Sequence, residues 1–123
     1  MKSIYRYSAS LILMLGLNAG VFAGDYAEGF IAAESYDYPT AVKILGPLAD
    51  QGNADAQFNI ALMYHSGAGV TANEPEAVKW YTKAAKNGHR TAKEYLAAAY
   101  AEGWFGLAQD EKMARFWYSK LDD

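Results

Sequence analysis

The stretch ADAQFNIALMYHSGAGVTANEPEAVKWYTKAAKNG, residues 54–88, decides the fold because its pattern recurs along the chain. At an offset of 36 positions, small, aromatic and glycine residues coincide: Ala56 with Ala92, Ala61 with Ala97, Tyr64 with Tyr100, and Gly67 with Gly103. One extra residue then makes the offset 37, and Trp80-Tyr81 recurs as Trp117-Tyr118. Self-similarity at such a period indicates a repeat architecture, in which one structural unit is stacked several times.

The same offset relates the stretch to the residues before it. Ala41 coincides with Ala77, and Leu45 coincides with Tyr81. The repeats therefore extend over nearly all of the chain that follows the first 23 residues.

Capping residues between the apolar segments indicate that each unit is a pair of helices. Asp37, Asn73 and Asp110 stand at equivalent positions, where each can cap a helix start. Pro39 and Pro75 follow two residues after the first two caps, within the first turn, where proline is tolerated. Each unit therefore reads as helix, turn, helix, turn.

Helix ends are marked by glycine. Gly52 and Gly88 stand where a helix can end in a left-handed residue, and Asn53 can cap the next helix. Glu76 is expected to complete a reciprocal capping box with Asn73.

Apolar spacing indicates which helix faces are buried. Ala56, Ile60 and Tyr64 form one stripe of a helix whose other faces are also poor in charge, so we expect it to be covered on more than one side. The second helix of the unit is amphipathic, with an outer stripe of Lys79, Lys83 and Lys86. We expect Tyr81 and Tyr118 to face inward, as packing residues rather than as a ligand platform.

Residues 54–88 resemble a Sel1-like repeat. The positions that carry the resemblance are Ala56-Gln57, Tyr64, Gly67, Gly69-Val70, Ala77, Trp80-Tyr81, Lys83-Ala84-Ala85 and Gly88. Residues 91–121 look like a second, more divergent copy, and residues 26–52 are similar to the tetratricopeptide helix pair that often opens such arrays.

The resemblance implies an all-α fold, an α-solenoid of about three antiparallel helix pairs. The expected single domain spans residues 24–123, with an opening pair at 24–52, a Sel1-like repeat at 53–88 and a divergent repeat at 89–123. Proteins of this family mostly act as scaffolds or adaptors that hold other proteins. Some cysteine-rich relatives bind or hydrolyse β-lactams, but this chain has no cysteine.

Residues 1–23 have the pattern of a signal peptide. Lys2 and Arg6 precede the apolar run SLILMLGLNAGVF, and cleavage is expected after Ala23. The alternative is an uncleaved membrane anchor, although Asn18 interrupts the run and leaves it short of about 20 apolar residues. Without a cysteine to carry a lipid, the sequence predicts a periplasmic or secreted protein with no stable membrane span after cleavage.

The charge balance disfavours one class of partner. Removing Lys2 and Arg6 from 11 basic residues leaves 9 against 14 acidic residues, a net charge of −5. Nucleic acid is therefore not an expected partner, since a phosphate-binding face needs a dense basic patch.

The sequence predicts no enzyme, no cofactor and no metal site. Two histidines, His65 and His89, are too few for a zinc site and are expected to be solvated. Ser66 beside His65 does not make a catalytic dyad, because adjacent helical residues point in different directions. The alternatives left open are a small periplasmic hydrolase on the same repeats, and a module that binds a peptide or glycan in an inner groove. That groove would be lined by Asn59, Met63, Tyr95 and Ala99.

The last unit departs from the middle one in its apolar content. Met113 and Phe116 replace Glu76 and Lys79, and the connector GWFG adds aromatic side chains. We predict a partner-binding surface, or a self-association surface, formed by Trp104, Phe105, Met113 and Phe116. In the alternative, Trp104 and Phe105 fold back over Met113 and close the end of the solenoid. The predicted function is an exported scaffold or adaptor that binds protein partners in the bacterial envelope.

Overall fold

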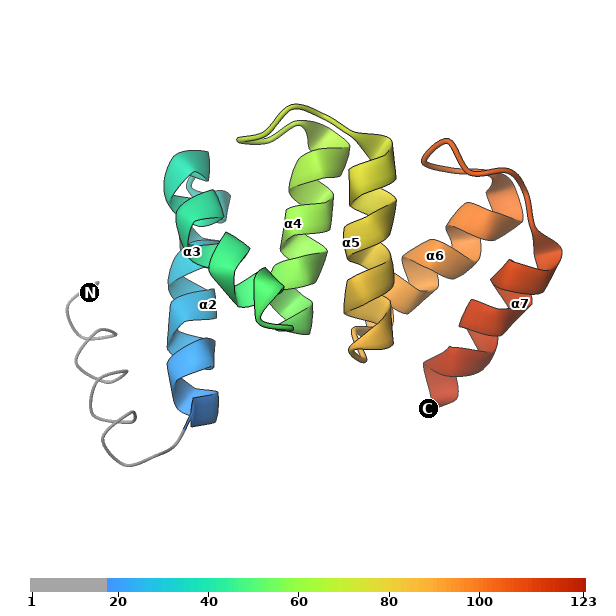
Figure 1. The fold of residues 1–123 in the computed structure, drawn as a ribbon, viewed down its shortest axis with the longest axis horizontal. Coiled ribbons are helices and arrows are strands. Elements are labelled where there is room, and N and C mark those ends of the chain that lie inside the picture. Colours follow the sequence, from blue (N-terminus) through green and yellow to red (C-terminus); the bar gives the residue numbers. More distant parts are fainter. Residues whose placement is uncertain (1–17) are drawn as a thin grey trace.

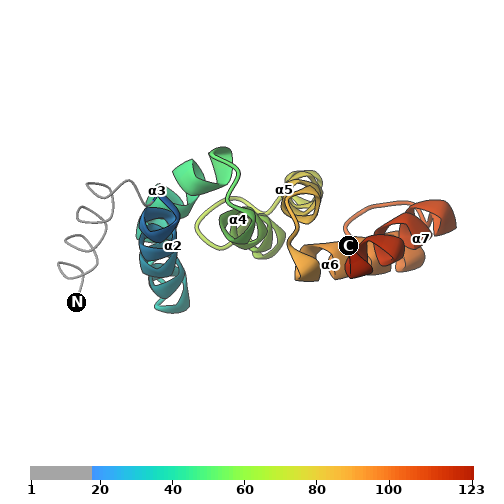
Figure 2. The ribbon, with the colours of Figure 1, turned by 90° about the horizontal axis from the view of Figure 1, so that it is seen from below.

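The computed structural model describes residues 18–123, with side chains from residue 24 onward. Helices follow one another through this part of the chain: α2 (Asn18–Glu34), α3 (Tyr38–Asp50), α4 (Ala54–Ser66), α5 (Glu74–Lys86), α6 (Arg90–Glu102), α7 (Glu111–Ser119) and the 3-10 helix η1 (Lys120–Asp122). They form three antiparallel pairs in one extended row, with α2 and α7 at opposite ends (Figures 1 and 2). The all-α solenoid is confirmed.

The predicted helix caps are confirmed. Asp37, Asn53, Asn73 and Asp110 each accept a hydrogen bond from the backbone N–H three residues later, at 2.9 to 3.4 Å. Each bond satisfies one of the free N–H groups of a helix start, which typically stabilises a helix by about 1 kcal/mol.

The capping box predicted at Asn73 is wrong in one of its two hydrogen bonds, the one from the Asn73 backbone N–H to the Glu76 side chain. The backbone N–H of Asn73 donates to the carbonyl of Tyr64 at 2.8 Å, and the Glu76 carboxylate lies 3.7 Å from the Lys79 ammonium. The equivalent bond recurs in the last repeat, where Asp110 donates to Tyr100 at 2.8 Å. A backbone bond to the first helix thus fixes the start of the second helix in both repeats.

Small residues let the two helices of each pair approach closely. Ala61 and Ala97 are fully buried where the second helix crosses. Gly29 of α2 lies at a similar crossing, and a Cβ there would come within 2.7 Å of the Leu45 side chain. The helices bury two neighbouring apolar clusters, one around Leu45 and one around Tyr81.

Only one of the two tyrosines expected to face inward does so. Tyr81 is 0% exposed, whereas its repeat equivalent Tyr118 is 50% exposed, so the prediction for Tyr118 is wrong. The ring of Tyr81 is covered by Phe58 of α4, Tyr95 of α6 and Phe105 of the last connector, at centroid distances of 5.7, 5.5 and 5.4 Å. Within residues 18–123 no further repeat stacks on α7 and covers Tyr118. The lysine stripe of α5 is exposed as predicted.

Most of the predicted signal peptide, residues 1–17, lies outside the described residues, and cleavage after Ala23 stays a prediction. Among the helices of the described part, none has the length and apolar character needed to cross a membrane.

Candidate protein-binding surfaces

The four predicted partner-binding residues divide into two exposed and two anchored side chains. Trp104, in the connector after α6, is 49% exposed, and Phe116, on α7, is 46% exposed. Phe105 and Met113 pack against the apolar cluster around Tyr81. Trp104 stacks edge-on against Phe105, and Phe116 stacks edge-on against Trp117. Each exposed aromatic side chain therefore rests on a buried or partly buried one.

Phe105 is anchored against the preceding repeat. Its ring lies 5.4 Å from that of Tyr81 and 4.6 Å from that of His65. The backbone is in the left-handed region at φ 55°, which costs a non-glycine residue about 1–2 kcal/mol. A tight turn, closed by the Leu107 N–H bonding the Trp104 carbonyl at 3.0 Å, holds this conformation. Phe105 thus folds back, as one alternative expected, but onto the middle repeat.

Phe116 lines a cleft of about 320 Å³ between α5, α6 and the end of the chain. Its charged lining residues are Lys86, Lys93, Lys120 and Asp123, and the Lys120 ammonium lies 3.0 Å from the Asp123 carboxylate. The Lys93 ammonium donates to the carbonyl of Lys120 at 2.7 Å, so this lysine is partly used in holding η1. In the sequence, the change from Lys79 in the middle repeat to Phe116 in the last repeat is what predicted an apolar surface here.

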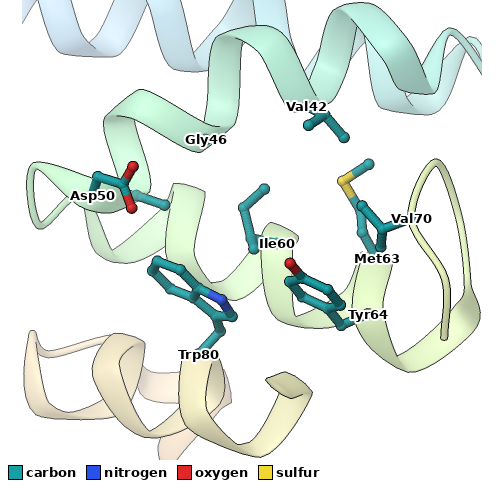
Figure 3. Close-up of a pocket in the computed structure, with 9 residues that line it drawn as sticks. Val42, Gly46, Asp50, Ile60, Met63, Tyr64, Val70 and Trp80 are labelled. Atoms are coloured by element: carbon teal, nitrogen blue, oxygen red, sulfur yellow. The ribbon is translucent and has the colours of Figure 1, made fainter. Parts of the chain in front are cut away.

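Trp80 lines a smaller apolar cleft that the sequence analysis did not predict. The cleft has a volume of about 130 Å³ and lies between α3, α4, α5 and the connector that follows α4. Figure 3 shows Trp80 of α5 facing α3, with Ile60 and Tyr64 of α4 between them. Asp50 is the single charged residue of the lining, and the Lys83 ammonium lies 4.2 Å from the Trp80 ring centroid.

The inner groove predicted from the first helices does not form as expected. Met63 and Ala99 are buried in the core, so their assignment to an open groove is wrong. The side-chain amide of Asn59 donates to the Tyr26 hydroxyl at 2.8 Å, which ties α4 to α2. Tyr95 is half-buried against Phe58 and Tyr81.

The two histidines have structural contacts. His65 contacts Phe105, and its Nδ1 lies 3.4 Å from the Tyr81 hydroxyl. Burial raises the pKa of Tyr81, so the hydroxyl stays protonated. His89 caps α6 by accepting from the Ala92 N–H at 3.1 Å. Among residues 18–123 no group of three metal-ligating side chains exists.

His89 is the titratable group most affected by the fold. Its side chain is 14% exposed and stacks on Phe58 at 4.3 Å, so the expectation of a solvated histidine is wrong for this residue. Burial lowers its pKa below the ordinary value of 6.5, and the nearby Asp55 carboxylate opposes this effect. Protonation of Nδ1 would also remove the lone pair that caps α6.

A pH dependence of stability follows from this lowered pKa. The unfolded chain binds a proton at His89 more readily than the folded chain does. The contribution of neutral His89 to the free energy of unfolding is therefore fully present above pH 6.5 and is lost as the pH falls through the lowered pKa. His89→Asn keeps a capping side chain but does not titrate. We expect the free energy of unfolding of the wild type to fall more than that of the variant between about pH 8 and about pH 5.5. Equal slopes in chemical denaturation would contradict this expectation.

Known Sel1 repeat proteins resemble this chain both in sequence and in fold. The Sel1 repeat model matches residues 54–89 and 91–121. A Sel1 repeat protein from Oxalobacter formigenes superposes with a TM-score of 0.76 at 27% identity, over 98% of this chain and 88% of that one. A protective antigen of uropathogenic Escherichia coli with an SLR fold gives a TM-score of 0.72 at 34% identity, over 85% of this chain and 23% of that one.

Curated relatives are much longer than this chain. DAP3-binding cell death enhancer 1 of Rattus norvegicus is 38% identical over 49% of this chain and 12% of its own length. Chitin synthase regulatory factor 2 of Schizosaccharomyces pombe is 26% identical over 94% of this chain and 21% of its own length. The chain therefore spans between about an eighth and a fifth of these relatives. Because the repeat model matches more than half of its residues, the chain belongs to the Sel1 repeat family.

Proposed function

We propose that the chain is a scaffold or adaptor protein of the bacterial envelope that binds other proteins and does not catalyse a reaction. Sel1 repeats generally mediate interactions between proteins. The observation that carries the proposal is Trp104, a large aromatic side chain presented to solvent on the rigid base formed by Phe105. Tryptophan is one of the residue types enriched among the few side chains that dominate binding energy at interfaces.

Export to the periplasm or beyond is part of the proposal. Its support is the basic start and apolar run that end at Ala23. The bacterial origin of two similar solved proteins favours a bacterial source. Protein partners are proposed together with self-association through the C-terminal repeat.

A binding role is favoured over a hydrolase by the use of the histidines. His65 and His89 are engaged in ring contacts and in a helix cap, as described above. Neither is arranged beside a nucleophile with a third group to orient it, as hydrolytic triads require.

The test begins with a partner captured on the exported protein from envelope extract, identified, and then purified for titration. We expect Trp104→Ser and Phe116→Ser together to weaken its binding by roughly tenfold or more, because both side chains are accessible. Single variants distinguish the two surfaces. Lys79→Ser, an exposed change at the position equivalent to Phe116, serves as the control.

Unchanged affinity of the folded double variant would sink the proposed surface. Turnover of a small substrate by the purified protein without a partner would overturn the non-catalytic role. Full-length protein found in the cytoplasm, with residues 1–23 intact by mass spectrometry, would overturn export.

A second candidate function is the recognition of a peptide in the cleft at Trp80. The observation that favours it is the apolar lining with Asp50 as its single charged residue, which suits an apolar side chain next to a basic one. Titration with peptides that carry such a pair, followed by Trp fluorescence, tests this candidate. The Asp50→Asn variant should weaken the binding of basic peptides only.

A further inference from the structure

The large apolar side chains exposed in the described part lie only in the first and last repeats. Phe30, Ile31 and Tyr36 belong to α2 and the turn that follows it. The others, Trp104, Phe116 and Tyr118, belong to the last repeat. The middle repeat, whose neighbours cover it on both sides, has none. In a solenoid each repeat contacts only its neighbours, so the end repeats carry the surfaces that further repeats would cover.

The junction between the middle and last repeats shows how such a surface is covered. Phe105, in the connector of the last repeat, packs its ring against those of Tyr81 and His65 of the middle repeat. Tyr81 is thereby completely buried. An aromatic side chain from one connector thus fills a site formed by the preceding helix pair.

The last repeat has the corresponding site, but it is open. Shifting by one repeat places Tyr118 on Tyr81 and Ala101 on His65. These two residues line a cleft of about 540 Å³ between α6, its connector and α7. The remaining lining residues are Gln109, Glu111, Ala114 and Arg115. Besides Tyr118 the lining thus combines two alanines with three polar or charged residues, of which Glu111 and Arg115 form an ion pair, and the volume of the cleft exceeds that of a tyrosine side chain.

The first connector carries a side chain of the required kind. Tyr36 joins α2 to α3, as Phe105 lies between α6 and α7. In the described part, Tyr36 and Phe105 are the non-glycine residues with positive φ, at 61° and 55°. Tyr36 is 79% exposed and touches only the edge of Tyr38 among aromatic rings. The positive φ belongs to the end of α2, where the Tyr36 N–H donates to the Ala33 carbonyl at 3.1 Å and the Asp37 N–H donates to the Ala32 carbonyl at 2.8 Å. The backbone of Tyr36 is therefore used in ending the helix, while its ring is left in solvent.

We propose that the protein associates head to tail with a second copy of itself, and that Tyr36 of one copy enters the Tyr118 cleft of the next. Like the internal junction made by Phe105, the contact places a connector ring on the second-helix tyrosine of the preceding pair, although Tyr36 stands one residue before its cap Asp37 and Phe105 stands five before Asp110. Figure 1 places the turn before α3 and helix α7 at opposite ends of the row of described helices, so the two surfaces lie far apart within one copy. Such a heterologous contact produces open chains or closed rings rather than a two-fold dimer.

Charge favours the same arrangement. The described side chains of α2 include the acidic Asp25, Glu28 and Glu34 and no basic residue. Helix α7 includes the basic Lys112 and Arg115 and the acidic Glu111. The two end helices therefore carry net charges of opposite sign, and association should weaken as salt is added.

This head-to-tail contact is a specific form of the self-association proposed above, and it involves no partner other than a second copy of the chain. Sedimentation velocity on the purified protein alone, over a range of concentrations, measures it. Tyr36→Gly should reduce the association constant at least tenfold, on the order of the loss of one central contact. Its fold should be retained, because glycine accepts a positive φ without strain. Tyr118→Ser should have a similar effect through the other surface.

Mixing the two variants gives the decisive result. Each retains one intact surface, so the Tyr36→Gly and Tyr118→Ser proteins should form a one-to-one heterodimer that neither forms alone. Lys79→Ser, an exposed change on α5 of the middle repeat, should associate as the wild type does. A monomeric wild type, association of Tyr36→Gly equal to wild type, or no heterodimer in the mixture would each overturn the proposal.

Different variants test the adaptor surface and the head-to-tail contact, so either proposal can fail while the other holds. Tyr36→Gly should still bind an envelope partner that uses Trp104, and Trp104→Ser with Phe116→Ser should still self-associate. Loss of capture with intact association therefore concerns the adaptor surface, and the reverse concerns the head-to-tail contact.

Discussion

Replacing Tyr81 by alanine is expected to lower the free energy of unfolding by about 3–5 kcal/mol, as for other large aromatic side chains removed from a core. Tyr81 is fully buried and contacts the rings of Phe58, Tyr95 and Phe105. Its removal leaves a cavity at the junction of the middle and last repeats, where the close-packed alanines cannot move inward to fill it. Urea denaturation followed by circular dichroism measures the loss.

Tyr118→Ala is the matched control. It makes the same chemical change at the equivalent position of the next repeat, where half of the side chain is exposed. We expect a cost below about 1 kcal/mol, because surface substitutions away from special contacts usually have small effects. At a concentration where the protein is monomeric, similar losses at the two positions would mean that Tyr118 is packed within its own chain, which would contradict its exposure.

The second large effect is expected at Gly69. This residue has φ 71°, and a Cβ there would lie 2.5 Å from the Cβ of Tyr38. Gly69→Ala therefore adds left-handed strain of about 1–2 kcal/mol and an overlap that costs about 1–3 kcal/mol more. The overlap involves a Cβ atom, which is fixed to the backbone of α3, so side-chain rotation cannot relieve it. Thermal or chemical denaturation should show a loss of roughly 2–5 kcal/mol in total.

Gly106→Ala separates the two contributions. Gly106 is equivalent to Gly69 and has the same φ of 71°, but a Cβ there would meet only the Glu74 carboxylate at 3.4 Å. This variant should show the strain alone, about 1–2 kcal/mol. The difference between the two variants measures the overlap with Tyr38, and no difference would argue against the close approach of the connector to α3.

Much of the fold could be predicted from the sequence because the signals that define it are local. Asp37, Asn73 and Asp110 cap helices through side chains that reach three residues along the same segment. The 36-residue offset then transfers each assignment from one repeat to the next. The resemblance to Sel1-like repeats predicts the same helix pairs as the capping residues and the repeat offset.

What could not be predicted depends on contacts between repeats. Tyr118 follows a tryptophan and precedes a lysine by two residues, as Tyr81 does, yet its exposure differs because no ring equivalent to Phe105 covers it among the described residues. The left-handed backbone of Phe105 is unusual for an aromatic residue and has no local signature.

The candidate surfaces were predicted in part for the same reason. The change from Lys79 to Phe116 is visible in the sequence and led to an exposed side chain. The cleft at Trp80 is formed by side chains from three helices and a connector, and its volume depends on how closely they pack. The spacing of residues along one helix does not reveal how closely that helix packs against its neighbours.

The hydrogen bonds from Asn73 to Tyr64 and from Asp110 to Tyr100 have a consequence for how this chain tolerates length variation. Each bond closes a loop at its base, so the residues within the loop do not determine where the next helix starts. The connectors at 35–37, 67–73 and 103–110 differ in length, yet each joins two antiparallel helices at the same edge of the molecule (Figure 1). That edge is therefore where insertions can accumulate during evolution, and where a foreign epitope could be grafted, without changing the stacking of the helices.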